Sequence, residues 1–130
     1  MKYHQIQLEK YKNSMSQAMD LINQSIQVKD SEPIMYFLRA VLSYYQENVI
    51  QAIPDIESAI EKADENITDH YTLRGLCYAY LKFYNDAIKD FSTLVKIDPD
   101  NPDGYFYRGK CYFLVGDFES AYDDYKSMTQ

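Results

Sequence analysis

Residues 70–78 read His-Tyr-Thr-Leu-Arg-Gly-Leu-Cys-Tyr, and residues 104–112 read Gly-Tyr-Phe-Tyr-Arg-Gly-Lys-Cys-Tyr. Aligned without a gap, the two stretches share Tyr, Arg, Gly, Cys and Tyr at the same positions. A shorter third copy reads Tyr-Phe-Leu-Arg-Ala at residues 36–40, which align with residues 71–75. Repetition with a period of about 20–50 residues is typical of chains that stack one structural unit several times.

Each unit also has a second apolar pattern, which follows the shared stretch. Its members are spaced by four and then three residues, so they lie on one face of a helix. The three sets are Ala52, Ile56 and Ala59, then Ala87, Phe91 and Leu94, then Ala121, Tyr125 and Met128. Each unit is therefore predicted to be two amphipathic helices joined by a short turn. The sequence 98–102, with Asn101 as an N-cap and Pro102 at the first helical position, ends one helix and begins the next.

The unit resembles the tetratricopeptide repeat, which has a period of about 34 residues. The matching residues in the second unit are Tyr71, Gly75, Tyr78, Ala87, Phe91 and Pro99, and those in the third are Tyr105, Gly109, Tyr112, Ala121 and Tyr125. The first unit keeps Tyr36, Ala40 and Ala52 but has Ser43 and Asp64 where Tyr and Pro are usual. The resemblance implies an all-α, right-handed superhelix of antiparallel helix pairs, with about three full repeats and a degenerate N-terminal one.

The expected division places all units in one domain. Residues 33–67, 68–101 and 102–130 form repeats, the last either complete or truncated, and residues 1–32 form a degenerate repeat or a capping helix. Met15, Ala18 and Ile22 mimic the second helix of a preceding unit, but too few apolar residues lie upstream for a normal first helix. Pro54 falls inside a predicted helix, which should therefore start late or kink.

The composition limits the possible partners and location. The net charge is −7, whereas binding to nucleic acid or to an anionic membrane surface needs an excess of Lys and Arg. No stretch has the length and hydrophobicity of a signal peptide or a membrane span, so we expect a cytoplasmic protein without membrane insertion. Cys77 and Cys111 are expected to be free thiols that fill the core.

Three Arg–Asp pairs recur at a spacing of sixteen residues: Arg39/Asp55, Arg74/Asp90 and Arg108/Asp124. Such recurrence predicts an ion pair between the two helices of a unit, or between one unit and its neighbour.

No constellation of residues indicates an enzyme, a metal site or a cofactor. His4 and His70 have no plausible partners for a zinc site or a catalytic triad. Asp98, Asp100 and Asp103 resemble the start of a calcium loop, but no Glu closes the twelve-residue frame. We therefore expect no catalytic activity.

The resemblance implies a concave groove lined by the first helix of each unit, and here that lining is rich in aromatic residues. The candidate partner-binding residues are Phe37, Val41, Tyr44, Tyr45, Asp69, Thr72, Leu76, Tyr80, Asp103, Phe106, Tyr107, Lys110 and Phe113. Exposed apolar patches mark contact sites, and Tyr is a favoured binding anchor. The carboxylate clamp found in some family members needs basic residues at positions that hold Phe37, Val41, Leu73, Asp103 and Tyr107 here.

The leading hypothesis is therefore an adaptor or chaperone-like scaffold that binds a peptide segment of a partner protein. Because acidic residues lie at the rim of the groove, we expect that segment to be apolar with some basic residues. Small acidic repeat proteins that act as chaperones for bacterial secretion substrates are similar in size and charge. The alternative is a structural module that self-associates, with its groove filled internally or by another copy. The homodimer contact would be the C-terminal edge, at Phe118, Tyr122, Tyr125 and Met128.

Overall fold

The computed structural model describes residues 2–28 and 32–130, with the side chains of Tyr3 and His4 outside the description. The expectation for His4 therefore lies outside the described residues. Within this part of the chain, all regular structure is helical. The helices are α1 (Lys2–Ile26), α2 (Pro33–Tyr45), α3 (Val49–Lys62), α4 (Thr68–Tyr80), α5 (Tyr84–Ile97), α6 (Pro102–Leu114) and α7 (Phe118–Met128).

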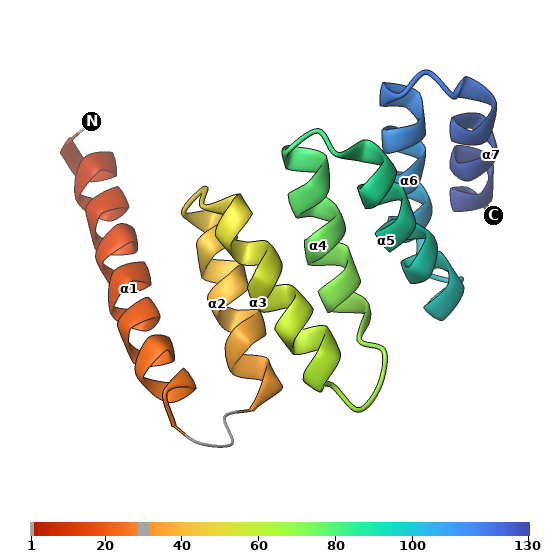
Figure 1. Ribbon diagram of the computed structural model, residues 1–130. Helices are drawn as coiled ribbons and strands as arrows, with labels where there is room; N and C mark the ends of the chain where they lie inside the picture. The colour runs from red at the N-terminus through yellow and green to blue at the C-terminus, as the bar shows by residue number, and fades with distance from the viewer. Residues whose placement is uncertain (1, 29–31) are drawn as a thin grey trace.

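The helices stack in a single row, as Figure 1 shows. Helices α2 and α3, α4 and α5, and α6 and α7 form antiparallel pairs, and each pair packs on the next through α3 with α4 and α5 with α6. The three turns within the pairs lie on one edge of the row, at the top of Figure 1, and the loops between pairs lie on the opposite edge. The all-α solenoid of helix pairs expected from the sequence is confirmed.

The three turns share one hydrogen-bonding pattern. In the first, the N–H of Asn48 donates to the carbonyl of Ser43 (2.8 Å) and the N–H of Glu47 donates to that of Tyr44 (3.0 Å). These two bonds define a Schellman motif, which ends a helix with one residue in the left-handed region. Glu47 has φ of 65° and Lys82, in the second turn, has φ of 66°. Because the same turn recurs, the second helix of each pair leaves the first helix in the same direction.

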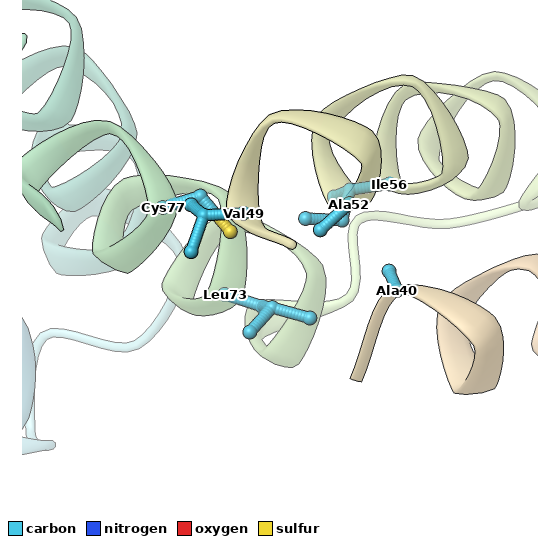
Figure 2. Close-up of a cluster of buried hydrophobic side chains, with 6 residues drawn as sticks. All are labelled: Ala40, Val49, Ala52, Ile56, Leu73 and Cys77. Carbon is cyan, nitrogen blue, oxygen red and sulfur yellow. The ribbon is translucent and has the colours of Figure 1, made fainter. Parts of the chain in front are cut away.

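The core lies between the helix pairs, and small residues allow the close approach. Figure 2 shows one cluster, in which Leu73 and Cys77 of α4 are buried together with four residues of the first pair: Ala40, Val49, Ala52 and Ile56. A second cluster contains Ala87, Phe91, Leu94 and Cys111. The expectation that both cysteines are free and buried is confirmed.

Gly75 and Gly109 allow an aromatic ring of the following helix to lie directly on the backbone. A Cβ atom at Gly75 would be 2.5 Å from Cε1 of Phe91, and one at Gly109 would be 2.8 Å from Cε1 of Tyr125. Real Cβ atoms are not found at such distances, so any larger residue would displace the ring. The equivalent position in the first pair is Ala40, where the facing helix carries the smaller Ile56.

The sixteen-residue Arg–Asp spacing produces the ion pairs that the sequence predicts. Each pair joins the two helices of one unit, with N–O distances of 2.6 Å for Arg39/Asp55, 2.7 Å for Arg74/Asp90 and 2.7 Å for Arg108/Asp124. All three aspartates are buried.

Helix α1 is one continuous helix of 25 residues, and it packs against α2. Met15 is buried, and Ile22 is half-buried on the same face. Helix α3 begins at Val49 and continues through Pro54, so the expected late start of this helix is wrong. The proline is tolerated because Pro54 and Ile50 are both exposed, which lets water bind the Ile50 carbonyl that lacks its helical donor.

Candidate functional site

A hollow of about 310 Å³ lies where the C-terminal halves of α2, α4 and α6 converge. Five of the thirteen candidate binding residues line it, namely Tyr44, Leu76, Tyr80, Tyr107 and Lys110. They come from three helices and three units, because each first helix presents the same face to this side. A hollow of this size, with aromatic walls and one cation, is within the range of ordinary ligand sites.

The tyrosine side chains of the hollow approach one another. Burial raises the pKa of Tyr44, and the neighbouring Cys77, Tyr107 and Tyr80 raise it further. Tyr107 stacks on the buried ring of Phe91, with centroids 5.3 Å apart, which fixes one wall of the hollow. Tyr80 is 56% exposed, so its ring is available to a partner.

Three further candidate residues, Tyr45, Phe106 and Phe113, are exposed but do not line this hollow. Tyr45 is 62% exposed and makes an edge contact with Tyr44, with centroids 6.0 Å apart. Phe106 packs edge-on against Tyr107 at 5.3 Å and is partly exposed. Phe113 makes an edge contact with Phe118 of α7 at 5.2 Å, which places it at the far end of the row.

Two candidate residues pack inward more than the sequence suggested. Phe37 is half-buried, and its ring lies 4.9 Å from that of His70. Val41 is half-buried against the core cluster of Ala40 and Leu73. Both residues contribute to the packing of α2 on α4, and neither lines the hollow.

Three polar candidates lie in the N-terminal halves of their helices and do not line the hollow. Asp69 and Asp103 are exposed in the first turns of α4 and α6, where a carboxylate is also stabilised by the helix dipole. The hydroxyl of Thr72 donates to the carbonyl of Thr68 at 2.9 Å, so it is satisfied within its own helix.

Beyond the thirteen candidates, the hollow is also lined by Ala79 and Leu114 of the first helices, and by Tyr84, Phe91 and Cys111, which the sequence did not place in the groove. Tyr84 and Phe91 belong to α5, a second helix of its pair, and Cys111 is buried on α6. The resemblance implies a lining of first helices, whereas the ring of Phe91 on the second helix α5 lies directly against the backbone of Gly75.

The titratable groups near the site are poorly suited to act as nucleophiles or as general acids and bases. Burial raises the pKa of Cys77 to about 12 and also raises that of Cys111, so both remain protonated thiols. Burial lowers the pKa of His70, whose Nδ1 is buried without a hydrogen-bond partner.

Across residues 2–28 and 32–130, no group of three or more His, Cys, Asp or Glu could hold a metal ion. None of the described helices is long and apolar enough to cross a membrane.

Comparison with known proteins agrees with the architecture. Residues 75–116 match the family model described as TPR repeat. No curated protein sequence matches the chain significantly. The repeat match over residues 75–116, together with an α-solenoid fold shared with solved structures, confirms the resemblance seen in the sequence.

Several solved structures share this fold at low sequence identity. The crystal structure of MamA superimposes with a TM-score of 0.83 at 18% identity, over 88% of this chain and 67% of that one. YrrB, described as a TPR protein with an unusual peptide-binding site, has a TM-score of 0.80 at 19% identity, over 91% of this chain and 60% of its own. PcrH, in complex with the chaperone binding region of PopB, has a TM-score of 0.71 at 17% identity, over 78% and 82%. The chain therefore spans less than two thirds of YrrB.

Proposed function

We propose that this chain is an adaptor or chaperone-like scaffold that binds a peptide segment of a partner protein on the face formed by α2, α4 and α6. The observation that carries the proposal is the convergence of Tyr44, Tyr80 and Tyr107 from three units around one hollow. Tyr supplies large contact area at low conformational-entropy cost, which makes it a common binding anchor. Binding, rather than catalysis, is the use that this arrangement supports.

The comparisons add support from proteins of the same fold. YrrB is described as having a peptide-binding site, and PcrH was solved with the chaperone binding region of PopB. The net charge of −7 and the exposed Asp69 and Asp103 favour an apolar partner segment that carries basic residues.

Affinity capture from a lysate of the source organism tests the proposal. The groove variant is Tyr45→Ala/Tyr80→Ala/Phe106→Ala, which removes three exposed rings and should leave the fold intact. The matched control is Leu21→Ala/Ile34→Ala/Tyr122→Ala, which removes three apolar side chains that are also exposed but lie elsewhere. We expect the wild type and the control to retain a protein that the groove variant loses. Equal retention by all three forms, or no retention, would contradict the proposal.

The C-terminal edge supports self-association as a second candidate function. Phe118 is 61% exposed and Tyr122 is 65% exposed on α7. Met128 is half-buried, and Tyr125 packs inward against Gly109, so neither belongs to this outer surface. A concentration-dependent dimer in light scattering that Phe118→Ser/Tyr122→Ser dissociates would favour this candidate, and a monomer at all concentrations would exclude it.

A further inference from the structure

Two further hollows lie along the edge where the helix turns lie, and each shares a lining residue with its neighbour. The first, of about 560 Å³, lies between α1 and the turn from α2 to α3 and includes Tyr11 and Glu47. The second, of about 370 Å³, lies between that turn and the end of α4, and includes Glu47, Ile50 and Tyr80. Tyr80 also lines the third hollow, of about 310 Å³. Because neighbouring hollows share Glu47 or Tyr80, the three form one path, which we name the turn-edge track.

Exposed apolar side chains follow this track, one in each successive unit. Tyr11, Tyr45, Tyr80 and Leu114 lie one repeat apart along the chain and are exposed by 55%, 62%, 56% and 50%. The loops from α3 to α4 and from α5 to α6, on the opposite edge, expose mostly polar residues instead: Asp64, Glu65, Asn66 and Asp100. An apolar row that follows one edge is typical of a contact surface.

Helix α1 creates the first hollow because it is longer than the helix it packs against. It has 25 residues, whereas α2 has 13. Leu8, Tyr11 and Met15 lie on one helical face, at spacings of three and four residues. Met15 is 8% exposed, but Leu8 is 53% and Tyr11 55% exposed, so α2 does not cover the N-terminal part of this face. The uncovered turns of α1 extend the surface beyond the three helix pairs.

Three charged side chains line the track, and their signs alternate. Lys12 lies in the first hollow, Glu47 between the first and the second, and Lys110 in the third. A complementary occupant therefore has a cation near its middle and carboxylates near its ends. Three helix-to-helix steps of roughly 10 Å span about 30 Å, which an extended chain covers with about nine residues.

We propose that the turn-edge track binds an extended, apolar segment of a partner protein, with Lys or Arg opposite Glu47 and Asp or Glu opposite Lys12 and Lys110. This inference rests on the proposed function and adds the path and the charge pattern of the bound segment. The net charge of −7 argues against an anionic lipid surface as the occupant.

Selection from a phage library of random dodecapeptides against the immobilised full chain tests the inference. The enriched peptides are then synthesised with a fluorescent label, and their affinity is measured by anisotropy. We expect apolar sequences with a central basic residue and acidic ends. The track variant Tyr11→Ser/Ile50→Ser, which changes two exposed residues outside the concave groove, should weaken binding at least tenfold. Circular dichroism melting checks that each variant is folded.

A charge reversal with a matched control makes the test specific. Glu47→Lys should weaken binding of a peptide with a central Arg, and changing that Arg to Glu should restore it. Lys is compatible with this backbone, because Lys82 has nearly the same φ in the next turn. Glu61→Lys, the same Glu-to-Lys reversal at an exposed position outside the three hollows, should leave binding unchanged.

The other outcomes separate this inference from the proposed function. If the peptides bind the track variant normally but lose affinity for Phe106→Ala, the concave groove binds the peptide and the inference is wrong. If no peptide is enriched, peptide binding itself is contradicted. If light scattering shows a dimer that Tyr11→Ser/Ile50→Ser dissociates, the occupant is a second copy and the inference is again wrong.

Discussion

The guanidinium of Arg74 donates two hydrogen bonds to the carboxylate of Asp90, with Nε–Oδ2 at 2.9 Å and Nη2–Oδ1 at 2.7 Å. The same two-bond geometry joins the helices of the other two pairs. In two units the arginine also reaches the helix before its own, where Arg39 donates to Asn23 of α1 at 3.1 Å and Arg108 donates to Ser92 of α5 at 3.3 Å. The arginines therefore connect helices within units and between them.

Arg74→Glu should lower the free energy of unfolding by about 3–5 kcal/mol, the usual cost of breaking a buried pair. The side chain of Asp90 is 5% exposed, so its carboxylate would be left buried beside a second negative charge. Urea denaturation measures the loss. Lys89→Glu makes the same change in net charge at an exposed position of α5 and should have little effect.

Peptide binding should persist in folded Arg74→Glu, because Arg74 does not line the hollow. Unchanged unfolding of Arg74→Glu would show that the pair contributes nothing.

Gly75→Ala should be destabilising by about 1–3 kcal/mol, because the added methyl group overlaps the ring of Phe91. In a Phe91→Ile background the same substitution should be neutral or stabilising, since this combination reproduces Ala40 and Ile56 of the first unit. Urea denaturation of the wild type, both single variants and the double variant measures this coupling. Equal effects of Gly75→Ala in the two backgrounds would refute the account of close packing.

His70 should make stability depend on pH. The residue is 2% exposed, its Nδ1 has no partner, and burial lowers its pKa below the ordinary value of 6.5. The unfolded chain therefore binds a proton at higher pH than the folded one, so stability is lost as pH falls below about 6.5.

The variant His70→Met isolates this effect, because Met35 occupies the equivalent position of the first unit. Between about pH 7.5 and pH 5.5 the wild type should lose more unfolding free energy than the variant does. Identical pH dependence of the two proteins would mean that His70 does not titrate differently on folding.

Cys77 and Cys111 should resist modification in the folded protein. Their exposed fractions are 0% and 2%, and the pKa of Cys77 is about 12, so little thiolate exists at neutral pH. Ellman's reagent should react with neither thiol under native conditions and with both after unfolding in guanidinium. Rapid reaction of Cys111 in the native protein would indicate that solvent and reagent reach this thiol through the hollow.

The repeat unit made much of the fold predictable from sequence. Alignment of the units matched each arginine with its equivalents, so one Arg–Asp spacing predicted all three ion pairs. The same alignment identified Gly75 and Gly109 as close-approach positions. The contacts of Arg39 with Asn23 and of Arg108 with Ser92 also span sixteen residues, but toward the N-terminus, and only the forward spacing was considered.

The surface was harder to predict, because repetition does not say which equivalent side chains turn inward. Phe37 and Phe106 are equivalent by sequence, yet Phe37 packs on His70 of the next pair, whereas Phe106 is 43% exposed and contacts Tyr107 of its own helix. The continuous helix α1 was one of two alternatives, because its N-terminal half has no equivalent repeat. The hollow near Tyr11 could not be foreseen without knowing how far α1 extends past α2.

Amide chemical-shift mapping of the labelled chain with a phage-selected peptide tests most directly whether the face of α2, α4 and α6 binds a peptide. The largest shifts should occur in the C-terminal halves of these helices, around Tyr44, Leu76, Tyr80, Tyr107 and Lys110. Shifts confined to the outer face of α7, around Tyr122, or no shifts at saturating peptide, would contradict the proposed binding function.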